Sequence, residues 1–168
     1  MMLDSWQSRP TEEAYLFNPA FGGALICEFV KSFAGKDKPG APLTLVLIAL
    51  SVSLHGQSRA KLPKMISASF YQWVQNNEDI LIGFSERTFS LRPHIMEAIR
   101  FSVAAQALQF VGGHTIGLGG KAALYTPGKI QTETIETVRI VEQTRMLGRW
   151  FSKSGEESFI LSAFGVKP

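Results

Sequence analysis

Large apolar side chains recur every four residues near the start of the chain. They form one ridge made of Phe17, Phe21, Leu25, Phe29 and Phe33. That spacing is typical of one face of an α-helix. Because Pro19 interrupts the ridge, we expect the helical pattern to break there. A short opening helix is therefore predicted to begin at Ser8 or Thr11, and a longer helix to cover residues 19–33.

The segment that follows a loop at 35–40 is apolar on every side. Between residues 43 and 54 only threonine and serine interrupt the apolar run. Its length favours a buried helix, although its β-branched residues leave a buried strand open. A short basic turn and a loop come next. Ser67 or Ser69 then caps a helix that carries Trp73.

Two helical stripes and two short alternating runs occupy the middle of the chain after Glu78. Pro93 stands between the stripes, just past the first helix and in the first turn of the second, which ends near Gln106. The alternating runs flank Gly112-Gly113, a strong hairpin signal because both central positions of a primed turn favour positive φ. Helix, turn, helix and hairpin in this order predict a winged helix-turn-helix.

The last part of the chain predicts two more helices. After a loop at 119–129, a long helix begins with Thr132 as its cap and ends at Gly155. A short helix over 156–165 follows and brings further apolar residues to the core.

The fold class that these elements predict is mainly α. We expect one helical domain with a winged helix-turn-helix-like lobe and one short β-hairpin. The single domain covers residues 1–168 and consists of an N-terminal helical lobe over 1–75, a winged-helix-like lobe over 76–131 and C-terminal helices over 132–168 that pack back. A chain of 168 residues is long enough to form the hydrophobic core of such a domain, since it buries roughly 70% of its unfolded surface.

Charge and composition narrow the function classes. The 17 Lys and Arg residues against 14 Asp and Glu give a net charge of +3, which is weak for a nucleic-acid binder. Cys27 is the only cysteine, which forbids an internal disulfide and fits a reducing compartment. No apolar run approaches the ~20 residues of a membrane span, and the acidic N-terminus argues against export. We therefore expect a cytoplasmic protein without a membrane partner.

The sequence carries no catalytic, metal or cofactor motif. His55, His94 and His114 stand far apart, with no paired cysteine or carboxylate at ligand spacing. No serine lies in a Gly-x-Ser-x-Gly elbow. The glycine-rich loop at 117–121 lacks both the first glycine of a P-loop and the Ser or Thr that follows its lysine. We expect neither an enzyme nor a bound metal or cofactor.

Basic side chains remain as candidates for contacts with DNA or a partner protein. Arg92 and Arg100 lie on the predicted recognition helix. His114 lies at the tip of the hairpin and Lys121 follows it. Two further groups are Arg59, Lys61 and Lys64 in the basic loop, and Arg145, Arg149 and Lys153 along the last long helix. For the helix group, a solvated end that offsets the helix dipole is favoured over a binding face. For the loop group the two interpretations are balanced.

A set of short motifs carries a family resemblance over nearly the whole chain. In order, they are Glu12-Glu13-Ala14 followed by residues 17–21, Leu54-His55, the segment 59–63, Trp73, Phe84 with Glu86-Arg87, Leu91 with Pro93, the segment 97–101, the segment 147–151 and Phe164-Gly165-Val166. Their order resembles the middle component of bacterial three-component ABC-ATPase systems. One departure is the pair of glycine doublets, at 112–113 and 119–120, where a compact acidic or polar hairpin is expected.

The resemblance implies a small non-enzymatic adaptor subunit. It implies two partners, an SMC-type ABC ATPase and a variable third protein that acts as effector, in systems that act in conflict with phage or plasmids. ATP binding and hydrolysis would belong to the partner ATPase, and this chain would couple its state to the effector or to DNA. The alternative is a winged-helix DNA-binding transcription regulator that uses Arg92 and Arg100.

Overall fold

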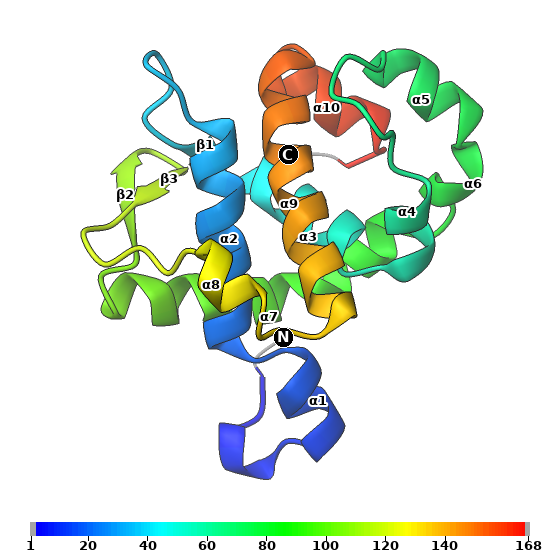
Figure 1. Ribbon diagram of the computed structural model, residues 1–168. Helices are drawn as coiled ribbons and strands as arrows, with labels where there is room; N and C mark the ends of the chain where they lie inside the picture. Colours follow the sequence, from blue (N-terminus) through cyan, green and yellow to red (C-terminus); the bar gives the residue numbers. More distant parts are fainter. Residues whose placement is uncertain (1–2, 167–168) are drawn as a thin grey trace.

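The computed structural model describes residues 3–166, which are mainly helical with a small antiparallel sheet (Figure 1). The helices are η1 (Trp6–Ser8), α1 (Thr11–Leu16), α2 (Pro19–Phe33), α3 (Leu43–Ser53), α4 (Gly56–Ala60), α5 (Phe70–Asn76), α6 (Glu78–Leu81), α7 (Phe84–Ala104), α8 (Pro127–Ile130), α9 (Ile135–Lys153) and α10 (Glu157–Ala163). The strands are β1 (Ala41–Pro42), β2 (Leu108–Gly112) and β3 (Thr115–Leu118). No helix within the described residues is both long and apolar enough to cross a membrane.

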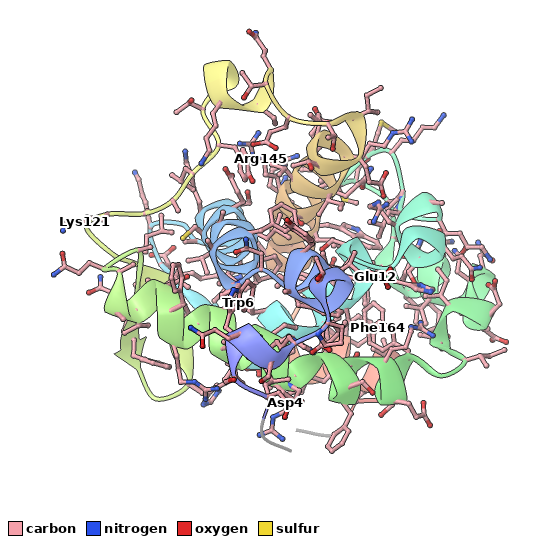
Figure 2. All side chains as sticks on the ribbon, turned by 90° about the horizontal axis from the view of Figure 1, so that it is seen from below. Asp4, Trp6, Glu12, Lys121, Arg145 and Phe164 are labelled. Atoms are coloured by element: carbon pink, nitrogen blue, oxygen red, sulfur yellow. The ribbon has the colours of Figure 1, made fainter. Side chains whose placement is uncertain are left out.

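Helices α2 and α3 form the middle layer of the molecule. Each of them packs against both α7 and α9. Figure 2 shows α9 and α7 toward opposite sides of the view, with α2 and α3 between them. This sandwich explains why the segment from residue 43 to 54 is apolar on every side, and it confirms the buried helix predicted there.

Glycines let the helices approach α2 closely on both sides. A Cβ placed on Gly148 of α9 would lie 2.7 Å from the carbonyl oxygen of Phe29. On the other side, a Cβ on Gly23 would lie 2.0 Å from the Oγ of Ser102 in α7. A larger side chain at Gly148 would meet main-chain atoms of α2 and push the two helices apart, whereas one at Gly23 would first displace the Ser102 hydroxyl.

An aromatic cluster centred on Phe70 joins α5 to the two C-terminal helices. Its ring lies near those of Trp73, Trp150, Phe151, Phe159 and Phe164. The indole N–H of Trp150 donates to the carbonyl of Ala68 at 2.9 Å, and that of Trp73 donates to the carbonyl of Lys61 at 2.8 Å. These two bonds attach the loop between α4 and α5 to the core.

The N-terminal segment is held on α7 by a bidentate ion pair. The guanidinium of Arg9 donates to both carboxylate oxygens of Glu97, each at 2.6 Å, and also to the carbonyl of Asp4 at 2.9 Å. The side chain of Arg9 is only 3% exposed. Two parallel charge-assisted bonds of this kind fix orientation as well as distance.

The sheet has the antiparallel order β1-β3-β2. The hairpin predicted around Gly112-Gly113 is confirmed, and both glycines have positive φ. Strand β1 pairs Ala41 with Ile116 and Pro42 with Thr115. We did not predict this strand, because two residues carry no periodic pattern.

Several helix boundaries agree with the sequence. The Asn18 side chain accepts a hydrogen bond from the N–H of Ala20 at 2.8 Å and caps α2, as the break at Asn18-Pro19 suggested. Ser69 caps α5, and α10 lies within the predicted final helix. Thr134 caps α9 instead of the predicted Thr132, and the predicted loop at 119–129 contains the start of α8.

The helix break predicted at Pro93 is wrong. Helix α7 runs without interruption from Phe84 to Ala104 and contains Pro93. The proline removes one helical hydrogen bond. Buried residues on both sides of it, Phe84 and Ile95 among them, belong to the same core, so packing keeps the two halves in one helix. A mainly α fold with a hairpin is thus confirmed, whereas a winged helix-turn-helix is not.

Candidate interaction surface

Two adjoining hollows between α9 and the segment from α4 to residue 64 form one groove. Their volumes are about 400 and 370 Å³, and Lys64 and Gln143 line both. The charged residues that line them are Arg59, Lys64, Arg139, Arg145 and Arg149, with Glu136 and Glu142. We call this surface the basic groove. It brings together two residues of the predicted loop group, Arg59 and Lys64, and two of the predicted helix group, Arg145 and Arg149.

Two cations of the predicted loop group, Arg59 and Lys61, form ion pairs with acidic residues of the same chain. Arg59 donates to the carbonyl of Ser53 at 2.6 Å and pairs with Glu136, which joins α4 to the start of α9. Lys61 pairs with Asp79, and this ammonium lowers the pKa of the aspartate. Lys64 is exposed and makes no ion pair within residues 3–166.

Arg145 is a half-buried structural partner that lines the groove. Its guanidinium donates to the carboxylate of Glu28 at 2.7 and 2.9 Å and to the carbonyl of Tyr125 at 2.7 Å. The same carboxylate accepts the N–H of Tyr125 at 2.6 Å. Hydrogen bonding to Glu28 raises the pKa of Arg145. Glu28 lies among apolar residues of α2, and a buried carboxylate needs a cationic partner. Its position in the sequence therefore indicates that a basic residue pairs with it.

The rest of the α9 group is exposed. Arg149 lines the groove, whereas Lys153 lies at the end of the helix and does not. The structure adds Arg139, which the sequence analysis missed. One face of α9 carries side chains at intervals of three or four residues, namely Arg139, Gln143, Met146 and Arg149. That spacing indicates that Arg139 shares a surface with Arg149.

The other predicted contact residues lie away from the basic groove. Arg92 and Arg100 are exposed on α7, on the far side of α2 and α3. His114 is exposed on the hairpin, with its Nε2 atom 3.9 Å from a carboxylate oxygen of Glu157. Lys121 projects from the loop after β3, at the edge of the view in Figure 2. The structure therefore does not unite the ten predicted contacts into one face.

Cys27 and His55 each contact a main-chain group close by. Cys27 is buried, which raises the pKa of its thiol, and its Sγ lies 3.6 Å from the carbonyl of Ala107. His55 caps α4 by accepting the N–H of Ser58 on Nδ1, and burial lowers its pKa. In the part of the chain that the structure describes, no three His, Cys, Asp or Glu side chains gather as a metal site.

Comparison with protein families matches residues 6–168 to the ABC-three component (ABC-3C) system Middle Component 3. The chain belongs to this family. The match confirms the resemblance carried by the short motifs, and it covers α7, α9 and the whole of the basic groove. No curated protein and no solved structure matches the chain.

Proposed function

We propose that the chain is a non-catalytic adaptor that links an SMC-type ABC ATPase to an effector in a bacterial defence system. Membership of a middle-component family supports this role. In this proposal the chain acts in the cytoplasm, and the partner ATPase binds and hydrolyses ATP.

The observation that carries the proposal is a pair of exposed helical faces separated by a buried layer. Helix α9 and the basic groove lie on one side of α2 and α3, and α7 lies on the other. An adaptor needs two surfaces that can be occupied at the same time. This arrangement supplies them without overlap.

Electrostatics indicate what the basic groove recognises. Lys64, Arg139 and Arg149 are exposed and make no ion pair within residues 3–166. Cations without partners attract an acidic surface and raise its rate of association. We therefore assign the groove to an acidic face of one partner.

The test is co-purification of the chain with the ABC ATPase and the third protein encoded beside it. The double charge reversal Lys64→Glu with Arg149→Glu is expected to weaken one of the two contacts by roughly tenfold or more. Lys121→Glu with Lys153→Glu makes the same change of charge outside the groove and serves as the matched control. A chain that associates with neither protein would sink the adaptor proposal.

The same three cations favour duplex DNA as a second candidate. Each phosphate contact releases counterions, so a cation that touches DNA contributes about 1 to the slope of log affinity against log salt. Measuring duplex binding at several salt concentrations tests this. Binding below about 10 μM whose salt slope falls in the Lys64→Glu variant would support DNA contact, and an absence of binding would leave the adaptor.

A further inference from the structure

A second groove opens on the α7 side of the molecule, between α3, α7 and residues 165–166. Its volume is about 570 Å³. Its apolar walls are Leu43 and Leu47 of α3, Phe89 and Met96 of α7, and Val166. We call it the α3–α7 groove. It lies on the α7 side of the buried α2–α3 layer, and Figure 2 shows α7 and α9 toward opposite sides of the view.

The groove holds two polar groups without partners in the described part of the chain. Thr88 is 6% exposed, and its Oγ1 atom makes no hydrogen bond. Arg92 is exposed and makes no ion pair. Buried polar groups in native proteins are nearly always paired, so the Thr88 hydroxyl is available for a hydrogen bond with a bound molecule.

Apolar exposure points to the same place. The side chain of Phe89 is 70% exposed although it borders the groove. A large aromatic side chain in water loses the free energy that burial would provide. Most of the walls come from two helices, and no lining residue belongs to a strand, so a helix fits the groove better than an added strand. Nucleic acid is disfavoured, because Arg92 is the one cation among the lining residues.

We infer that the α3–α7 groove binds an amphipathic helix of a partner protein that places large apolar residues on its walls and an acidic residue against Arg92. Apolar anchors at spacings of three and four would contact Phe89 and Met96 together. The carboxylate would pair with the guanidinium, and a polar atom beside it would reach Thr88. This inference rests on the proposed adaptor function and specifies the chemistry of one of its partners.

A peptide selection tests the inference without knowledge of the partner. The probe is a phage-displayed library of peptides of about 16 residues, roughly four helical turns, selected on the full chain. We expect helical sequences with apolar residues at i, i+3 or i+4, and i+7, and with Asp or Glu on the flank. Fluorescence polarisation of the synthetic consensus peptide then measures the dissociation constant.

Variants of exposed residues separate the groove from the rest of the surface. Phe89→Ser and Arg92→Glu are each expected to weaken the peptide by roughly tenfold or more, without unfolding the chain. The Arg92→Glu loss should be recovered by a peptide whose acidic residue is changed to lysine. Phe101→Ser and Arg100→Glu lie on α7 outside the groove and should stay within about twofold of the wild type.

Two results would overturn the inference. One is a selection that yields no peptide sensitive to Phe89→Ser and Arg92→Glu. The other is a wild-type dimer in analytical ultracentrifugation that Phe89→Ser dissociates, because a second copy would then occupy the groove. Co-purification with the ATPase and the effector stays a separate readout. If it succeeds while the peptide test fails, only the inference about the groove is lost. If it fails while the peptide test succeeds, the adaptor proposal is lost.

Discussion

Replacing Arg145 by methionine tests how strongly the buried ion pair with Glu28 holds α9 on α2. Methionine keeps the length and most of the apolar volume of the arginine side chain. It removes the three hydrogen bonds that the guanidinium donates to Glu28 and to the carbonyl of Tyr125. Glu28 then keeps only the N–H of Tyr125 as a described partner for its charge.

The expected loss of stability is about 3 kcal/mol. Removing one partner of a buried pair costs about 3–5 kcal/mol, because the other charge stays buried without compensation. The side chain of Glu28 is 3% exposed, but that of Arg145 is 28% exposed, so water reaches one end of the pair. This access places the cost at the lower end of the range. For a chain of this size, 3 kcal/mol corresponds to a fall in Tm of about 6–12 °C.

Urea unfolding followed by circular dichroism measures the free energy of unfolding of each variant. The control is Arg149→Met, about one turn further along α9, which should change the stability by less than about 0.5 kcal/mol because Arg149 is exposed. The double variant Glu28→Gln with Arg145→Met removes both charges and keeps an acceptor for Tyr125. It should be about 1–2 kcal/mol more stable than Arg145→Met alone.

Two outcomes would refute this reasoning. A loss below about 1 kcal/mol for Arg145→Met would mean that the pair contributes no more than an exposed one. A double variant no more stable than the single one would mean that the cost does not come from an uncompensated charge on Glu28.

Two further predictions concern α9 and the N-terminal segment. Gly148→Ala should lower the free energy of unfolding by about 1–3 kcal/mol, because the new Cβ would lie 2.7 Å from the Phe29 carbonyl oxygen. Gly128→Ala is the control, since its Cβ would enter open space. Equal melting temperatures for the two variants would contradict this prediction. The Arg9 guanidinium lowers the pKa of Glu97 from its ordinary value of 4.5. The Arg9–Glu97 pair therefore stabilises the folded chain fully above about pH 4.5, and this stabilisation is lost as the pH falls through the lower pKa of Glu97 in the folded state. Urea unfolding at several acidic pH values should show a weaker pH dependence for Glu97→Gln than for the wild type, and parallel curves would disprove it.

The sequence predicts best those elements whose burial pattern is local. Helix α2 follows from aromatic residues spaced by four, and α3 from an unbroken apolar run of helical length. Pro93 misled the prediction because its cost is visible in the sequence, whereas the packing that outweighs it comes from distant parts of the chain. Strand β1 could not be predicted, since its partner lies far away in the sequence and its two residues have no period.

The candidate surfaces were predictable only in part, for a similar reason. Charge alone identifies Lys64 and Arg149 as candidates, and the structure leaves both exposed in one groove. Charge in the sequence identifies Arg145 as a candidate in the same way, but its partner within the protein, Glu28, lies more than a hundred positions away. The α3–α7 groove has no sequence signature, because its apolar walls resemble ordinary core positions until the fold shows Phe89 in solvent.

The proline inside α7 also changes what the helix offers at its surface. Because Pro93 has no N–H, the carbonyl oxygen of Phe89 cannot accept the usual helical hydrogen bond from the residue four positions later. Phe89 also lines the α3–α7 groove, so the residue that loses this main-chain bond is one of the groove's apolar walls. Helix α7 therefore has one hydrogen bond fewer in the turn that carries Phe89 and Arg92 than a proline-free helix would have.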